Sequence, residues 1–149
     1  MIHVECLPDE TLMKCLGFGK KEIMHHYGKS RVLTALSKKE NQIAVVDEDP
    51  GQAQHPYFRN FKFKQAQKGL TEYLDNKNNK LIELKIKLED WIITDCRNTS
   101  IELKKFGLPD KPNDLHDVIN NRIQAFQDLI EALLKDKKSA VSALKKCLS

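Results

Sequence analysis

Short apolar runs alternate with stretches of helical spacing through the first third of the chain. The runs occupy residues 2–7, 23–27 and 42–46, and their length and β-branched content predict strands. Between them, two sets of apolar residues recur at the spacing of a helix face, namely Leu12, Met13 and Leu16, and then Val32, Leu33 and Leu36. The order strand, helix, strand, helix, strand is typical of an α/β domain with a parallel sheet.

The middle of the chain predicts a loop, a helix and one more strand. Residues 52–64 have no clear period and are expected to form a long loop, and residues 65–75 are expected to form a helix. Residues 82–88 alternate strictly between apolar and charged side chains, which predicts a strand with one buried face. With the three strands before it, this strand completes a central, mostly parallel four-stranded sheet flanked by helices.

Helical spacing dominates the last third of the chain. Apolar residues recur every three or four positions after Leu88, then along a long helix over residues 115–134, and again in a final helix that Ser139 caps. We therefore expect an α/β domain over residues 1–97. A C-terminal helical extension over residues 98–149 is expected to pack on the same domain.

Composition places the chain among ordinary globular proteins. It has 149 residues, of which 40% are hydrophobic and 31% charged, and this size suits a single core. No stretch approaches the roughly 18 uncharged apolar residues of a membrane span, so no membrane contact is expected. The four cysteines form no CxxC pair, and the chain opens without the basic and apolar regions of an export signal. These features favour reduced thiols and a cytoplasmic location.

The net charge of +4 is unevenly distributed. Residues 1–58 hold seven basic and eight acidic residues and residues 88–149 hold ten of each, whereas residues 59–87 hold eight basic and three acidic residues. Phenylalanines are interleaved with the first basic residues of this central stretch. Such a segment could follow a phosphate backbone, so nucleic acid is the partner that it predicts, and a solvated surface is the alternative.

A pair of carboxylates follows the most apolar predicted strand. Asp47 and Asp49 are two residues apart, and because side chains alternate along a strand, both would project to one side. Two carboxylates in that position repel each other unless a divalent cation binds between them. The sequence Asp-Pro-Gly that begins at Asp49 also fits an ordinary turn.

Further acidic residues are expected at the same edge of the sheet. Glu5 ends the first strand as Asp47 ends the third, and the carboxyl ends of parallel strands form the crevice in which ligands bind. Asp9 follows at the start of a helix, and Glu89 and Asp90 lie where the last strand passes into a helix. For these three residues, a first-turn acid that interacts favourably with the helix dipole is the alternative interpretation.

The order of these motifs resembles the Toprim fold, which is shared by topoisomerases, bacterial primases, recombination-repair proteins and OLD-family nucleases. The resemblance is carried by the strand that ends in Glu5, by Asp9, and by the later strand that ends in the Asp-x-Asp motif of Asp47 and Asp49. It covers residues 1–97 and implies a Toprim-like Rossmannoid fold. It also implies that Glu5 acts as a general acid/base and that Asp47 and Asp49 bind Mg²⁺.

The departures from the Toprim pattern narrow the branch that the chain resembles. Cys6 stands where the family usually has a Gly directly after the Glu. No topoisomerase domain with a nucleophilic Tyr and no primase zinc domain is recognisable. The small stand-alone or OLD-nuclease-like branch is therefore the one expected.

The expected chemistry is hydrolysis of phosphodiester bonds in DNA or RNA. An all-carboxylate site without paired His or Cys suits Mg²⁺ or Mn²⁺, which could activate a water while Glu5 transfers the proton. The candidate metal ligands are the acidic residues Glu5, Asp9, Asp47, Asp49, Glu89 and Asp90. Lys29, Lys85 and Lys87 are the lysines that could hold a phosphate nearby, and a solvated surface position is the alternative for each of them.

Two other functions fit the same sequence. A non-catalytic Toprim-like module that binds nucleic acid or a partner protein agrees with the small size and with Cys6. Phosphatase or phosphotransfer chemistry with Asp47 as nucleophile fits the Asp-x-Asp pair, although Gly51 stands where the haloacid-dehalogenase pattern expects Thr or Val. The long helix over residues 115–134 is expected to cover one side of the sheet, and a homodimer through this helix is the alternative.

Overall fold

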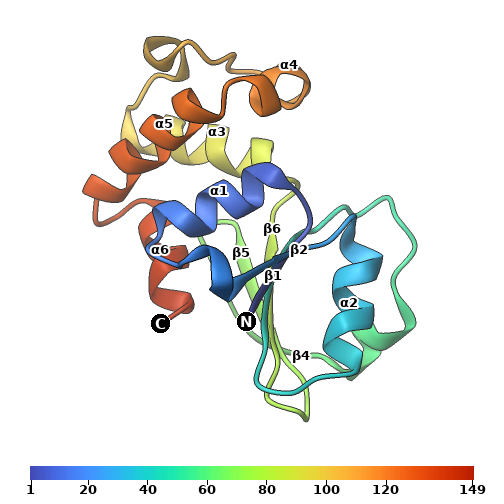
Figure 1. Cartoon of the computed structure of the whole chain (residues 1–149). Coiled ribbons are helices and arrows are strands. Elements are labelled where there is room, and N and C mark those ends of the chain that lie inside the picture. The colour runs from blue at the N-terminus through green and yellow to red at the C-terminus, as the bar shows by residue number, and fades with distance from the viewer.

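Six strands form one mixed sheet at the centre of the protein, as the computed structural model of residues 1–149 shows (Figure 1). The order across the sheet is β2-β1-β3-β6-β5-β4. The first four strands of that order are parallel, whereas β5 pairs antiparallel with both β6 and β4. The strands are β1 (Ile2–Val4), β2 (Ile23–His25), β3 (Ile43–Asp47), β4 (Lys62–Gln67), β5 (Leu70–Leu74) and β6 (Lys80–Leu84).

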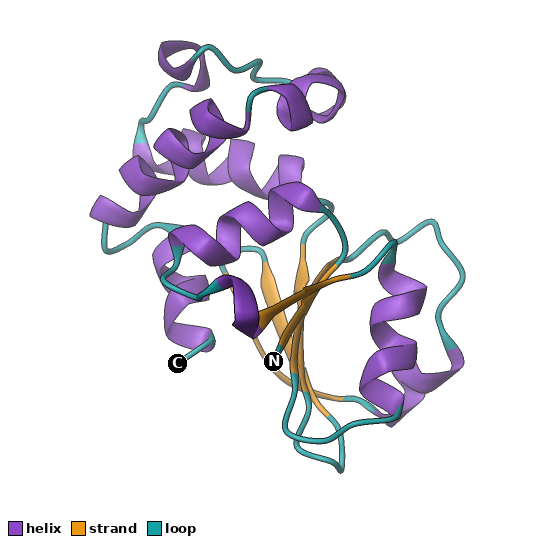
Figure 2. Cartoon of the chain, in the orientation of Figure 1, coloured by secondary structure: helices purple, strands orange, loops and turns teal.

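Helices cover both faces of the sheet (Figure 2). α2 lies on one face, and α1, α3, α5 and α6 gather on the other, where α4 packs against α3. The helices are α1 (Leu7–Cys15), α2 (Lys29–Ser37), α3 (Leu88–Thr99), α4 (Pro112–Val118), α5 (Ile123–Lys135) and α6 (Ala140–Cys147).

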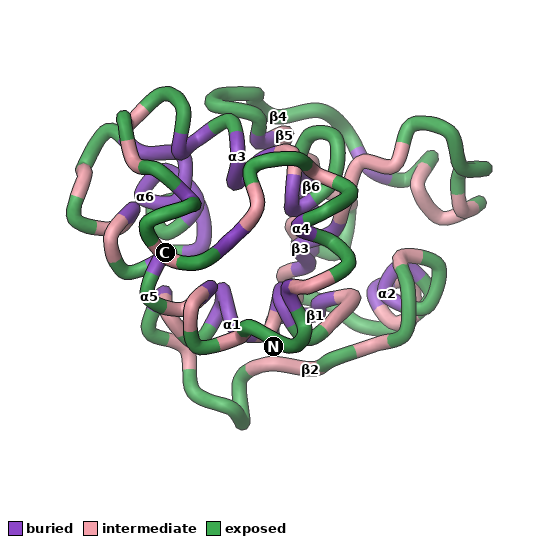
Figure 3. Tube along the Cα trace, turned by 90° about the horizontal axis from the view of Figure 1, so that it is seen from above, coloured by how far each residue is buried: buried purple, intermediate pink, exposed green.

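The alternation of side chains along the central strands creates one hydrophobic core on each face of the sheet. Val45 on β3 belongs to the larger core, whereas its neighbours Ala44 and Val46 belong to the smaller core beneath α2. Figure 3 shows the same division, with α2 on the opposite side of the strands from α1, α5 and α6. β3 is buried on both faces, and this explains why its sequence is almost continuously apolar.

The C-terminal helices help to enclose the larger core. Phe126 on α5 and Leu144 on α6 are fully buried in the same core as the central strands. Asp95 on α3 holds the start of α6, because its two carboxylate oxygens accept the N–H groups of Ala140 at 2.8 Å and Val141 at 3.0 Å. The residues after α3 therefore pack on the sheet through one shared core.

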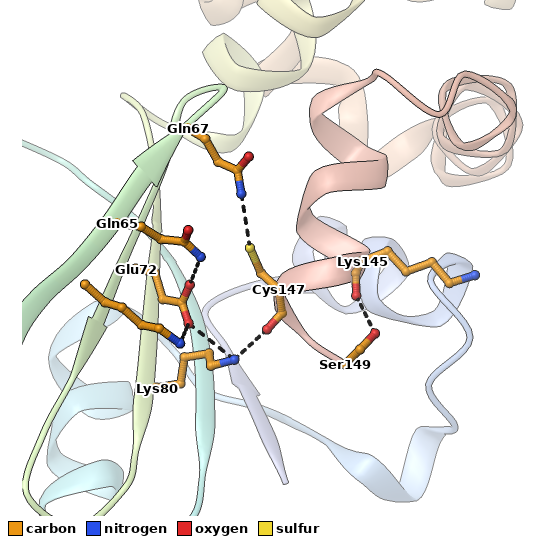
Figure 4. A network of polar contacts seen from close by, with 8 residues as sticks. Gln65, Gln67, Glu72, Lys80, Lys145, Cys147 and Ser149 are labelled. Carbon is orange, nitrogen blue, oxygen red and sulfur yellow. Dashed lines mark hydrogen bonds and ion pairs between the residues drawn. The ribbon is translucent and has the colours of Figure 1, made fainter.

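A polar network also ties α6 to the sheet (Figure 4). Nζ of Lys80 donates to the carbonyl oxygen of Cys147 at 2.6 Å and lies 3.3 Å from Oε1 of Glu72. The buried Glu72 also accepts a hydrogen bond from Nε2 of Gln65 at 2.6 Å. Gln65 belongs to β4, whose pairing with β5 shifts register between Phe63 and Gln65 in a β-bulge.

The structure confirms the α/β class and corrects the number of strands. The predicted helix over residues 65–75 is wrong, because this segment forms β4, a tight turn and β5. Lys68 and Gly69 in the turn have positive φ values of 49° and 74°, which no helix accommodates. β5 then pairs with β6, so the sheet has six strands rather than four. Pairing with a buried strand overrides the helical propensity of the segment.

The last parallel strand is shorter than predicted. The alternating segment over residues 82–88 was expected to be one strand, but β6 ends at Leu84. The next three residues, 85–87, are exposed and leave the sheet before α3 begins at Leu88. The apolar side chain of Ile86 is therefore on the surface rather than in the core.

The loop predicted over residues 52–64 and the long helix predicted over residues 115–134 each consist of more than one element. Residues 52–64 contain a 3₁₀ helix at Pro56–Asn60 and the start of β4. The helix expected over residues 115–134 is interrupted between α4 and α5, where Arg122 has the non-helical angles φ −130° and ψ 40°. The cap of the final helix is confirmed, because the side chain of Ser139 accepts the N–H of Ser142 at 3.0 Å.

Gly69 is expected to tolerate no side chain, because its φ of 74° is left-handed and a Cβ would lie 2.9 Å from Cδ1 of Trp91. We expect Gly69→Ala to lower the free energy of unfolding by about 2–4 kcal/mol, of which about 1–2 comes from the left-handed backbone and the rest from displacing Trp91. Urea denaturation measures the loss. Gly107→Ala is the matched control, because its φ is 73° and its Cβ would meet no atom within 4 Å. Equal losses in the two variants would contradict the role of Trp91.

Candidate functional site

Glu5 and Asp47 meet at the carboxyl edge of the parallel strands. β1 and β3 are neighbours, so Glu5, directly after β1, and Asp47, the last residue of β3, end at the same edge. Oε2 of Glu5 accepts the backbone N–H of Asp47 at 3.0 Å. Oδ1 of Asp47 in turn accepts the N–H of Leu88 at 2.8 Å, at the N-terminus of α3, where the helix dipole favours negative charge. These two hydrogen bonds join β1, β3 and α3 at one point.

Asp9 adds a buried carboxylate from the first turn of α1 and is only 1% exposed. Its Oδ2 accepts a hydrogen bond from the thiol of Cys6 at 3.1 Å, whereas its Oδ1 has no partner. Burial, with the charges of Glu5 and Glu89, raises the pKa of Asp9 to about 7. Buried polar atoms are rarely left without a partner. A cation or a hydrogen-bond donor placed next to this oxygen would therefore interact favourably with it.

Like charges surround Asp47. Its pKa is raised to about 9, first by burial and then by the carboxylates of Asp9, Glu5 and Glu89. Burial also raises the pKa of Glu5, against the opposing effects of its hydrogen bond from Asp47 and of the charge on Lys29. Glu5, Asp9, Asp47 and Glu89 thus form one electrostatically linked group, which we call the carboxylate cluster.

Glu89 belongs to the cluster through its charge, and it also makes a contact that the sequence did not predict. The side chain is buried in the first turn of α3, and its Oε1 lies 2.9 Å from Nδ1 of His116 on α4. His116 is 27 residues away in sequence, and only the packing of α4 against α3 brings the two together. The hydrogen bond from Cys6 to Asp9 was also not predicted, and the residue's position after Glu5 was its only signal.

Asp49 lies at the rim of the cluster and not along the strand. Its carboxylate is 3.7 Å from Nζ of Lys87, and its charge raises the pKa of Glu5, although burial is the larger cause. Its φ is 46° and its carbonyl accepts the N–H of Gln52 at 3.0 Å, so Asp49 begins a turn, as the Asp-Pro-Gly sequence predicts. Its own N–H donates to the carbonyl of Ile86 at 3.1 Å, which connects the turn to the loop before α3.

The lysines predicted to hold a phosphate differ in their contacts. Nζ of Lys29 is bound within the protein, by Oε2 of Glu83 at 2.7 Å and by the carbonyl of Glu48 at 2.9 Å. Lys87 faces Asp49 at the rim of the cluster. Lys29 therefore affects the cluster through its charge, and its side-chain hydrogen bonds are made to Glu83 and Glu48 within the protein.

Lys85 and Asp90 lie apart from the carboxylate cluster. Lys85 is exposed, makes no ion pair, and lines a cavity that Asp90 also lines. Adjacent residues on a helix point about 100° apart, so Glu89 can face the cluster while Asp90 faces the cavity. The structure thus brings together four of the six predicted metal ligands, places Asp49 at their rim, and leaves Asp90 in the neighbouring cavity.

The chemistry of the cluster suits a hard divalent cation, although no ready-made metal group is present. No three His, Cys, Asp or Glu side chains are placed to hold an ion together. The cluster nevertheless offers only carboxylate oxygens, which are the ligands that Mg²⁺ and Mn²⁺ prefer. One of these oxygens, Oδ1 of Asp9, is buried without a partner. Burial is the main cause of the raised pKa of Asp47, and the repulsion from neighbouring carboxylates that adds to it is of the kind that a cation relieves.

Comparisons of the chain with known protein families, with curated proteins and with solved structures find no match. None of its helices combines the length and the apolar character needed to cross a membrane. The function therefore has to be inferred from the carboxylate cluster and the residues around it.

Removing the charge of Asp47 is expected to flatten the dependence of stability on pH. Its carboxyl has a pKa of 3.8 when unfolded and about 9 when folded, so it stabilises the fold at low pH and loses that contribution as the pH rises through 9. Relative to Asp47→Asn, the wild type should therefore lose stability between about pH 4 and pH 9. Asn keeps an oxygen that can accept the N–H of Leu88.

Chemical denaturation of both proteins across this pH range measures the difference in their free energies of unfolding. Asp128→Asn is the control, because Asp128 is exposed on α5 and lies outside the cluster. If the free energies of unfolding of the wild type and Asp47→Asn change in parallel with pH, the pKa of the Asp47 carboxyl is not raised in the folded protein.

Proposed function

We propose that the protein is a Mg²⁺- or Mn²⁺-dependent hydrolase of phosphodiester bonds in nucleic acid, with a Toprim-like site. The observation that carries this proposal is Oδ1 of Asp9, a buried carboxylate oxygen without a partner beside Glu5 and Asp47. The cluster also lies where neighbouring parallel strands end, which is where open α/β sheets bind their ligands.

Three members of the cluster, and Asp49 at its rim, have a role in this proposal. Asp47 and Asp9 would hold the cation, with Asp49 at the rim as a further ligand, and the bound cation would activate a water and stabilise the leaving oxygen. Glu5 is the general acid/base, because burial raises its pKa and lets it hold a proton closer to neutral pH than an exposed Glu would. The thiol of Cys6 positions Asp9, and burial raises the pKa of this thiol so that it remains a donor.

Nucleic acid is the substrate that the surrounding charge favours. The segment over residues 59–87 has eight basic and three acidic residues, and its last members, Lys85 and Lys87, lie in the loop that adjoins the cluster. The carbonyl of Ile86 in that loop accepts the N–H of Asp49, so the basic loop and the acidic rim are in direct contact. A polyanion could thus be held by the lysines while its backbone meets the carboxylates.

A non-catalytic module that binds nucleic acid is the second candidate. Oε2 of Glu5 and Oδ1 of Asp47 already accept backbone N–H groups, and no three carboxylates of the cluster are placed to hold one ion together. These observations favour a structural role for the cluster, in which its carboxylates bind backbone N–H groups and no metal ion. The two candidates differ in whether phosphodiester bonds are cut.

Cleavage assays with Asp47→Asn test the hydrolase. We expect the wild type to nick supercoiled DNA or to cleave labelled RNA in Mg²⁺ or Mn²⁺ and to be inactive in EDTA. We expect Asp47→Asn to lower the rate about 10²-fold or more, because this carboxylate is central to the cluster. Single-turnover assays on gels measure the rate, and Asp128→Asn should retain the activity of the wild type.

Two outcomes would contradict the proposal in different ways. Wild-type rates in the double variant Asp47→Asn with Asp49→Asn would place the activity outside the cluster. Nucleic-acid binding without cleavage in either metal would instead support the binding module.

A further inference from the structure

A cavity of 570 Å³ is bordered by the loop that contacts Asp49 at the rim of the carboxylate cluster. It lies between the β4–β5 turn, the loop after β6, α3 and the start of α6. Lys85 and Ile86 line it, and because the carbonyl of Ile86 accepts the N–H of Asp49 at 3.1 Å, one loop borders both the cavity and the cluster. On α3, Glu89 belongs to the cluster, whereas the next residue, Asp90, lines the cavity.

Unused hydrogen-bond donors are concentrated in this cavity. Five exposed lining side chains carry N–H or O–H groups that no ion pair or hydrogen bond within the protein uses, and these are Lys85, Thr94, Arg97, Asn98 and Lys138. Three of them are cations, and they come from three different segments of the chain. Donors that line a cavity and have no acceptor within the protein are suited to an anionic ligand.

The carboxylates that line the cavity are mostly occupied. Asp95 is buried and accepts two backbone N–H groups at the start of α6. Asp110 lies 3.7 Å from Nζ of Lys104. Asp90 alone has no partner, so the free charges around the cavity are predominantly positive.

Buried contacts hold the floor of the cavity in place. Trp91 is 2% exposed, donates from Nε1 to the carbonyl of Lys68 at 3.0 Å, and packs against Gly69. The side chain of Lys68 donates to the carbonyl of Lys138, and the N–H of Lys85 donates to the carbonyl of Gly69 at 2.9 Å. The cavity is thus preformed, which lowers the entropic cost of binding.

We propose that this cavity binds phosphate groups of a nucleic-acid strand through Arg97 and Lys85, beside the phosphodiester that the carboxylate cluster acts on. Arg97 presents a planar fork of donors that matches phosphate oxygens, and Lys85 adds a charge on the loop shared with the cluster. The identification of the ligand as nucleic acid rests on the proposed function. The affinity for phosphate rests on the free donors alone.

Binding measured without metal tests the cavity separately from hydrolysis. The probe is a short fluorescein-labelled single strand, as DNA and as RNA, titrated with the full chain in EDTA and followed by fluorescence anisotropy. Arg97→Glu should weaken the affinity about tenfold or more, and Arg97→Gln should reduce the slope of log K against log salt by about 0.7, the value for one phosphate contact on a single strand.

Lys21→Glu is the matched control. Lys21 is exposed just before β2, at the margin of the sheet opposite β4, and lies outside both the cavity lining and the basic segment over residues 59–87. Its replacement changes the charge by the same amount. We expect its effect on affinity to be smaller than about threefold, since it removes only a long-range attraction that salt screens. Circular dichroism checks that both variants remain folded.

The outcomes separate this inference from the proposed function. Absence of binding by the wild type, or equal losses in Arg97→Glu and Lys21→Glu, would overturn the cavity as a phosphate site. Cleavage by the wild type with unchanged binding in Arg97→Glu would overturn the cavity and leave the hydrolase standing. Loss of binding in Arg97→Glu, with no cleavage by the wild type in either metal, would support the cavity and overturn the hydrolase.

Discussion

Asp47 joins three elements, and the carboxyl edge of the sheet depends on it. Its N–H donates to Glu5 after β1, and its Oδ1 accepts the N–H of the buried Leu88 at the start of α3. That N–H has no acceptor within the helix, so loss of the carboxylate would leave it unsatisfied in the interior. Because the same residue holds the fold, the carboxylates around it stay close despite their repulsion, and Asp9 remains buried beside them.

Local periodicity was sufficient to predict the first third of the chain. The apolar runs, and the apolar residues at helical spacing between them, predict the strands and helices as far as Asp47. The spacing of the apolar residues identifies the buried face of each of these elements. The β4–β5 hairpin could not be predicted in this way. Its turn at Lys68 and Gly69 is shaped by contact with Trp91, and its strands are stabilised by pairing with β6. Such contacts join residues far apart in sequence, and no short window contains them.

The candidate site shows the same division. Glu5 and Asp47 could be placed together from the sequence, because neighbouring parallel strands end at one edge. Glu89 and Asp90 could not be distinguished, since the direction of each depends on the rotation of α3 about its axis. His116 approaches Glu89 only because α4 packs on α3, and a single histidine on a predicted helix carries no signal for that contact.

The margins of the sheet limit how this protein can associate. β4 forms one margin and all of its residues are exposed, so its backbone could in principle pair with a strand from another molecule. Lys62 and Lys64 place charge along this margin, and the bulge between Phe63 and Gln65 interrupts its regular hydrogen bonding. At the other margin, β2 is only three residues long. Neither margin is a good template for a further strand, so the open sheet resists edge-to-edge aggregation without closing into a barrel.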